Sequence, residues 1–194
     1  MLNDVRIQRR LVHLSGTAVP VAYLLDVVSW QTVKWLLAGG ALAVVVLEFV
    51  RLYVGLDWVV FDRLTRDYEQ TNPGGYALAV VGAALVGWTF EPRVAVTAIL
   101  LLTVADPISG VLSTVEDPDT AKSLGVMGVT FLVCLAITGA LLPLSAAIPT
   151  ALVAVAADAL KPRVYGFVID DNFSIPVSAA VVASLFLAYV PPLL

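Results

Sequence analysis

Charge, cysteine and histidine are all scarce in this sequence. Lysine, arginine, aspartate and glutamate make up 13% of its 194 residues, about half the share found in soluble domains. With 60% hydrophobic residues, the chain cannot cover a surface that faces water, which excludes an ordinary soluble protein. The single cysteine excludes an intramolecular disulfide framework. Acidic residues outnumber basic ones by 15 to 11, which argues against nucleic acid as a partner.

Long apolar runs account for most of the sequence. A membrane-spanning helix needs about 20 mostly apolar residues. We predict seven spans, of which the third and sixth are short: 11–30, 33–54, 76–90, 93–113, 124–144, 146–160 and 173–194. The chain is therefore expected to form an all-α, polytopic transmembrane bundle, a single domain over residues 1–194. Frequent alanine and glycine favour close packing of helices in lipid.

The basic residues predict the orientation of this bundle. With seven spans and a cytoplasmic N-terminus, nine of the eleven lysines and arginines fall in inner segments, and only Lys34 and Arg93 fall outside. The positive-inside rule thus favours a cytoplasmic N-terminus in the cell membrane. Thirteen of the fifteen acidic residues lie on the same side, the exceptions being Asp26 and Glu91. Because acidic residues contribute little to orientation, their sorting indicates a functional site that faces the cytoplasm.

Four ionisable residues lie near the inner ends of different predicted spans: His13, Glu48, Asp106 and Asp158. Ionisable groups inside a membrane are costly, so each one is a functional candidate. His13 is either a site residue or a helix-end residue at the interface. Glu48 precedes Arg51 by three positions, so it forms an ion pair with it, or it serves as a site wall or proton acceptor.

The Asp106-Pro107 pair stands inside an apolar run. We expect the proline to break the helix and to expose backbone that lines a cavity, although a kinked structural helix is the alternative. Asp106 offers a hard oxygen ligand for Mg²⁺. Ser109 and Gly110, one turn later, would let a phosphate approach closely.

Three further segments on the inner side carry candidates. Arg66 lies in a charged loop that is either a solvated interfacial segment or a phosphate-binding lid. Lys122 and Ser123 open the fifth span, where free N–H groups would attract an anion, unless Lys122 simply obeys the positive-inside rule. Asp171 and Asn172 open the seventh span, where they either cap the helix or contribute to a site for Mg²⁺ and a nucleotide.

A series of short motifs extends from Arg9 to Pro176: Arg9-Arg10-x-x-His13, Glu48-x-x-Arg51, Arg66-x-x-Glu69 with Gly75-Tyr76, Asp106-Pro107, Lys122-Ser123, and Asp171-Asn172-x-x-x-Pro176. In this order they resemble the dolichol kinase, phytol kinase and CTP-dependent diacylglycerol kinase family. The resemblance implies a multi-span enzyme with a cytosolic site. Such an enzyme transfers a phosphoryl group from CTP to the hydroxyl of an isoprenoid alcohol or a diacylglycerol-like lipid, with Mg²⁺ or another divalent cation.

The resemblance also implies roles for the polar residues. They are Mg²⁺ ligands (Asp106, Asp171), nucleotide or phosphate contacts (Arg66, Ser109, Gly110, Lys122, Ser123, Asn172), and groups that orient or deprotonate the lipid hydroxyl (His13, Glu48, Asp106, Asp158). Three other functions stay open: a CDP-lipid synthase similar to phosphatidate cytidylyltransferases, a transporter, and a non-catalytic scaffold. A transporter would place its polar residues at the midplane and repeat its two halves, and we find no such repeat in the sequence.

Overall fold

The chain is mostly helical in the computed structural model, which describes residues 2–55, 58, 61, 65, 69–113, 120–160, 163–164, 167–168 and 170–192. In chain order the α-helices are α1 (Leu2–Ser15), α2 (Ala18–Leu24), α3 (Trp30–Phe49), α5 (Gly75–Thr89), α6 (Pro92–Leu100), α7 (Asp106–Leu112), α8 (Leu124–Leu141), α9 (Leu144–Ala159) and α10 (Asp171–Tyr189). Two π-helical segments, η1 (Val50–Val54) and η3 (Leu101–Ala105), continue α3 and α6. A short antiparallel hairpin of β1 (Arg163–Val164) and β2 (Phe167–Val168) precedes α10. The predicted all-α class is confirmed.

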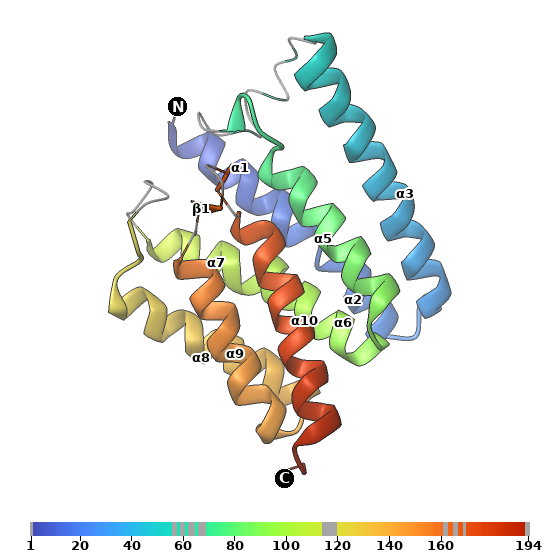
Figure 1. Cartoon of the computed structure of the whole chain (residues 1–194), viewed down its shortest axis with the longest axis vertical. Helices are drawn as coiled ribbons and strands as arrows, with labels where there is room; N and C mark the ends of the chain where they lie inside the picture. Colours follow the sequence, from blue (N-terminus) through green and yellow to red (C-terminus); the bar gives the residue numbers. More distant parts are fainter. Residues whose placement is uncertain are drawn as a thin grey trace.

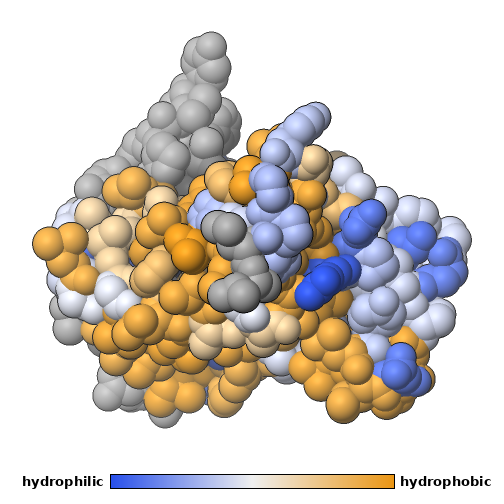
Figure 2. All heavy atoms as spheres, turned by 90° about the horizontal axis from the view of Figure 1, so that it is seen from below, coloured by the Kyte–Doolittle hydropathy of each residue, from blue (hydrophilic) through white to orange (hydrophobic). Residues whose placement is uncertain are grey.

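Four helical segments in the described part of the chain are long and apolar enough to cross a membrane: Trp30–Val54, Pro92–Leu112, Leu124–Leu141 and Asp171–Tyr189. Helices α5 and α9 are apolar but shorter. Hydrophobic residues cover most of the face seen in Figure 2, and hydrophilic residues gather toward one side of it. So large an apolar surface is not tolerated in water. The chain is therefore a multi-pass α-helical membrane protein.

Helices α9 and α10 pack against each other along small side chains. Alanines form the centre of the main core: Ala146, Ala147, Ala151 and Ala154 on α9, with Ala179, Ala180 and Ala183 on α10. On another face of α10, a Cβ added at Gly82 of α5 would lie 3.3 Å from the ring of Pro176. Because no large side chain separates the backbones, the helices approach closely, as membrane helices commonly do.

The first predicted span, 11–30, is not one helix. Helix α1 ends at Ser15, and α2 is a short helix that begins at Ala18. Pro20 lies in the first turn of α2 and has no N–H to donate to the preceding turn. Gly16 lies so close to Thr103 of η3 that an added Cβ would be 3.1 Å from the threonine methyl group. The expectation of a continuous helix was wrong because a proline and a close contact between segments interrupt it.

The Asp106-Pro107 pair does not break its helix, so that expectation was also wrong. Pro92–Leu112 is one continuous helical segment, and Asp106 has helical dihedral angles of φ −62° and ψ −48°. The residues before it instead widen into the π-helical turn η3, in which the Asp106 N–H donates to the Leu101 carbonyl. The wider turn accommodates the missing N–H of Pro107, which falls in the first turn of α7, where it is tolerated.

Polar helix ends gather at one end of the bundle. Helices α1, α5 and α10 all begin at the upper end in Figure 1, α9 runs toward it, and the C-terminus lies at the opposite end. The residues singled out from the sequence lie mainly on these helix ends. The fold therefore brings together groups that are far apart in the sequence.

Candidate functional site

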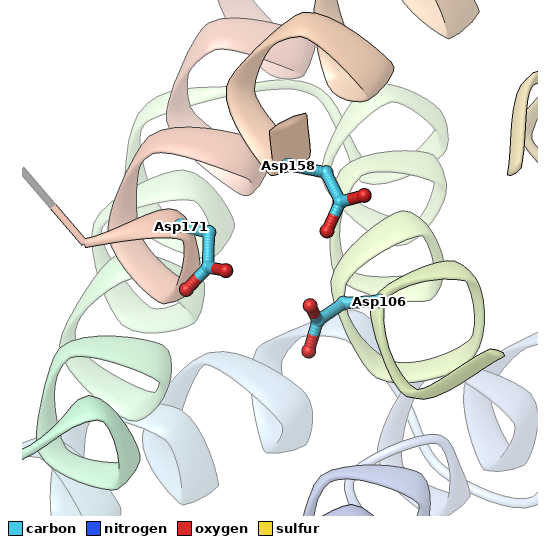
Figure 3. Close-up of side chains that lie close together, drawn as sticks. All are labelled: Asp106, Asp158 and Asp171. Carbon is cyan, nitrogen blue, oxygen red and sulfur yellow. The ribbon is translucent and has the colours of Figure 1, made fainter. Parts of the chain in front are cut away.

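Three aspartates from three helices face one another. Asp106 begins α7, Asp158 lies in the last turn of α9, and Asp171 begins α10. One carboxylate oxygen from each lies within 4.8 Å of the other two, and Figure 3 shows the three carboxylates pointing into the space between their helices. Asp158 and Asp171 are each only 3% exposed. We call Asp106, Asp158 and Asp171 the aspartate cluster.

Lys122 brings a positive charge to the cluster from the residues just before α8. Its Nζ donates to Asp158 Oδ1 at 2.6 Å and to Ser109 Oγ at 2.9 Å. The Ser109 hydroxyl in turn donates to Asp158 Oδ2 at 2.6 Å. Ser109 is fully buried. These three side chains form a closed network that fixes the Asp158 carboxylate and joins α7 and α9 to the start of α8.

The first turn of α10 explains how Asp171 can face the cluster. Its N-cap is Asp170, whose side chain accepts the Asn172 backbone N–H at 3.0 Å. The suggestion that Asp171 or Asn172 caps the helix was therefore wrong, because α10 begins at Asp171, earlier than the predicted start at residue 173. The cap held by Asp170 leaves Asp171 within the first helical turn, where its carboxylate reaches the cluster.

Helix α1 brings two basic side chains, His13 and Arg10, to α7 at the aspartate cluster. His13 Nδ1 lies 3.7 Å from Asp106 Oδ2. One turn earlier, the Arg10 guanidinium donates to the Gly110 carbonyl of α7. A Cβ added at Gly110 would lie 3.3 Å from Arg10 Nε, so the glycine allows the arginine to lie against the helix. The contact of Arg10 with Gly110 thus holds α1 against α7, and His13 lies beside the cluster.

Glu48 takes part in a different set of contacts. Arg51 donates to both of its carboxylate oxygens, at 3.0 and 2.7 Å, which confirms the ion pair. The Gly74 N–H donates to the same carboxylate at 2.9 Å, as does the Tyr76 hydroxyl. Arg51 also donates to the Asn72 carbonyl at 2.7 Å. The Glu48 contacts tie the end of α3 to the turn that precedes α5. Tyr76 was noted from the sequence only as part of the Gly75-Tyr76 motif, and the contact of Gly74 with Glu48 was not predicted.

Gly75, the first residue of α5, packs closely against Asn172 in the first turn of α10. A Cβ added at Gly75 would be 2.5 Å from Asn172 Nδ2 and 3.2 Å from Glu69 Oε1. Glu69 is 1% exposed, and its Oε1 lies 3.8 Å from Arg9 Nη2. Among the described residues the buried Asn172 Oδ1 has no hydrogen-bond partner. Asn172 was predicted to be a site residue, but its contact with Gly75 was not predicted, because a glycine in the sequence does not show which side chain packs against it.

The other residues predicted to bind phosphate differ in their contacts. Ser123 is the N-cap of α8, and its Oγ accepts the Val126 N–H at 3.4 Å. Ser109 is committed to the Asp158 network rather than open to a phosphate. Arg66 lies outside the described residues. Of the predicted phosphate contacts, Lys122 and Ser109 therefore lie at the cluster, and the phosphate-binding roles of all six residues stay predictions.

The aspartate cluster is an electronegative site. Lys122 offsets the charge of one of its carboxylates, that of Asp158. Two unit charges 4.8 Å apart repel by about 3.5 kcal/mol at an effective dielectric constant of about 20. Carboxylate oxygens are the ligands that Mg²⁺ and Ca²⁺ prefer. The arrangement is thus suited to a divalent cation.

Comparison with known proteins does not identify a family for this chain. The chain matches no protein family model, no curated protein and no solved structure. The resemblance drawn from its short motifs therefore stays a prediction.

Proposed function

We propose that this chain is an integral membrane phosphotransferase that phosphorylates the hydroxyl of a lipid alcohol, with CTP as the donor. The observation that carries the proposal is the aspartate cluster, in which three helices bring carboxylate oxygens within 4.8 Å of one another beside Lys122. Phosphoryl transfer depends chiefly on charge neutralisation and positioning. A carboxylate cluster with an adjacent lysine at one end of an apolar bundle supports both.

The cluster fits a Mg²⁺ ion by its donor chemistry. Mg²⁺–oxygen distances are about 2.0–2.1 Å, so two oxygens that bind one ion lie at most about 4 Å apart. The separation of up to 4.8 Å is close to that limit and needs only small side-chain movements. Asp106, Asp158 and Asp171 would hold the ion, which would neutralise charge on the donor phosphates when bound.

The proposal assigns two basic residues to the reaction. Lys122 has three N–H donors, of which Asp158 and Ser109 take two, and it directs the third to a phosphate oxygen. His13, beside Asp106, accepts the proton of the lipid hydroxyl. The hydroxyl oxygen then bonds to the terminal phosphorus of CTP, the bond from that phosphorus to the bridging oxygen breaks, and CDP leaves.

The proposal gives Glu48 a positioning role. Its carboxylate already accepts hydrogen bonds from Arg51, Gly74 and Tyr76, so its oxygens are occupied by donors within the protein. The Glu48 contacts would instead hold the turn before α5 next to the cluster. The full topology that we propose has seven spans, a cytoplasmic N-terminus and the cluster at the cytoplasmic face, in accord with the positive-inside distribution.

The decisive experiment is product analysis on the purified protein in lipid nanodiscs. Labelled CTP or ATP is supplied with Mg²⁺ and either an isoprenoid alcohol or diacylglycerol, and the lipid products are separated. We expect CTP-dependent formation of a lipid monophosphate that stops when Mg²⁺ is chelated. Asp106→Asn and Asp171→Asn are each expected to lower the rate by about a hundredfold or more.

A matched control is Asp26→Asn. Asp26 is an exposed aspartate with φ 55° in the turn between α2 and α3, and asparagine tolerates that backbone conformation. This variant should keep the wild-type rate. Equal rates for Asp106→Asn and the wild type would refute the site assignment. A product that retains CMP, with release of pyrophosphate, would instead identify a CDP-lipid synthase.

A further inference from the structure

Lys122 and the divalent cation of the proposed function require the same carboxylate, that of Asp158. Lys122 Nζ donates to Asp158 Oδ1 at 2.6 Å, and the Ser109 hydroxyl donates to Asp158 Oδ2 at 2.6 Å. Ser109 also accepts a hydrogen bond from Lys122 Nζ at 2.9 Å. The ammonium group therefore lies close to both oxygens of Asp158, and a cation bound to either oxygen would meet a positive charge there.

The distance between these two positive charges would be short. Mg²⁺ lies about 2.1 Å from a carboxylate oxygen, and Lys122 Nζ lies 2.6 Å from Asp158 Oδ1. An ion on that oxygen would thus lie at most about 4.7 Å from the ammonium nitrogen. The side chains of Lys122 and Asp158 are only 11% and 3% exposed, so little water screens the repulsion. Binding of both cations to Asp158 at once is therefore unfavourable.

A buried oxygen beside the cluster independently indicates a cation at this place. Asn172 is 2% exposed, and its Nδ2 donates to Asp171 Oδ1 at 3.4 Å. Its Oδ1 has no hydrogen-bond partner within the described part of the chain. A buried acceptor without a partner is costly, whereas an amide oxygen is a common ligand of divalent cations and of the waters that they hold.

Lys122 is the member of the ion pair that can move. It lies outside regular structure, two residues before α8 begins at Leu124, and its charge is carried on a flexible four-carbon chain. Asp158 lies in the last turn of α9, and Ser109 lies within α7. A new positive charge at the cluster is therefore expected to displace the ammonium group rather than the carboxylate.

We propose that Lys122 is a built-in counter-ion, which competes with a divalent cation for the Asp158 carboxylate and leaves it when the cation binds. Without the cation, the ammonium group offsets the charge of Asp158 next to Asp106 and Asp171. Once the cation is bound, the N–H that Asp158 accepted turns to the donor phosphate. The phosphate contact rests on the proposed function, whereas the competition for Asp158 does not.

The first test measures cation binding with Mn²⁺ as the probe. The protein is placed in nanodiscs of uncharged lipid, free Mn²⁺ is followed by its electron paramagnetic resonance signal, and nanodiscs without protein are subtracted. We expect Lys122→Met to bind Mn²⁺ about tenfold more tightly than the wild type, which corresponds to about 1.4 kcal/mol. A lysine that only supports the structure of the site predicts weaker binding in this variant. Unchanged or weaker binding would overturn the proposal.

The matched control is Lys34→Met, which removes the same charge elsewhere. Lys34 Nζ lies 5.1 Å from the centroid of the Trp88 ring. Trp88 is near the end of α5, about 20 Å along that helix from Gly75. This variant should bind Mn²⁺ with the wild-type dissociation constant. Equal tightening in both lysine variants would show a general effect of net charge and would also overturn the proposal.

The second test uses the wild-type protein, so it does not depend on a variant that folds. Lysines are reductively methylated with and without Mg²⁺, and the extent of methylation at Lys122 and Lys34 is read by peptide mass spectrometry. We expect Mg²⁺ to raise the methylation rate of Lys122 several-fold and to leave that of Lys34 unchanged. A Lys122 rate that Mg²⁺ leaves unchanged or lowers would overturn the proposal.

The outcomes separate this proposal from the proposed function. Tighter Mn²⁺ binding by Lys122→Met and Mg²⁺-dependent methylation of Lys122, without any lipid phosphate product, would refute the phosphotransferase and leave the counter-ion standing. An active phosphotransferase in which Lys122→Met binds Mn²⁺ no more tightly than the wild type would refute the counter-ion and leave the function standing. Absence of saturable Mn²⁺ binding in both proteins would also refute the counter-ion.

Discussion

The buried ion pair between Lys122 and Asp158 offers the sharpest test of the site's energetics. Lys122→Met keeps most of the side-chain volume but removes the charge that Asp158 faces. The side chains of Lys122 and Asp158 are 11% and 3% exposed, so water cannot replace the lost ammonium group. The variant leaves the Asp158 carboxylate uncompensated within 4.8 Å of Asp106 and Asp171.

The size of the effect follows from the geometry. At 2.6 Å two unit charges attract by about 6 kcal/mol at an effective dielectric constant of about 20. The cost of desolvating both groups offsets part of this attraction, and breaking a buried pair costs about 3–5 kcal/mol in practice. For a chain of this length that loss lowers the melting temperature by roughly 6–20 °C.

The assay is thermal unfolding in detergent micelles, followed by the fluorescence of the four tryptophans. The control is the double variant Lys122→Met/Asp158→Asn, which removes the stranded charge as well. We expect it to recover about 2 kcal/mol or more relative to Lys122→Met alone. A single variant within about 1 kcal/mol of the wild type, or a double variant no more stable than the single one, would show that the pair is not a buried, mutually dependent unit.

Two further predictions concern the contacts around the site. Gly75→Ala places a Cβ 2.5 Å from Asn172 Nδ2 and should destabilise the protein by about 1–3 kcal/mol, measured by the same unfolding assay. Gly139→Ala, where nothing lies within 4 Å of the added Cβ, should cost nothing, and equal melting temperatures for the two variants would contradict the reasoning. Tyr76→Phe removes a hydroxyl that donates to the Glu48 carboxylate and should cost about 1.5–3 kcal/mol, whereas a neutral effect would show that water replaces the hydroxyl.

Much of the fold could be predicted because membrane insertion depends on local composition. A run of about 20 apolar residues has few alternatives to a spanning helix, so the segments around α3, α6–α7, α8 and α10 were placed correctly. The two wrong predictions, a continuous helix over residues 11–30 and a helix break at Asp106-Pro107, arose where local backbone contacts decide whether a helix continues. The break between α1 and α2 depends on the contact of Gly16 with Thr103, and the π-helical turn before Asp106 replaced an expected break.

For the candidate site, too, some features follow from the sequence and others only from the tertiary structure. Sequence by itself determined that the carboxylates, Lys122 and His13 lie near the ends of apolar segments, because charge is too costly to scatter through lipid. Only the tertiary structure decided the partners: Lys122 with Asp158, His13 beside Asp106, and Glu48 with Arg51 and Tyr76. Those choices depend on how each helix is rotated and how closely its neighbours approach, and these are set by the packing of small side chains from all the helices together.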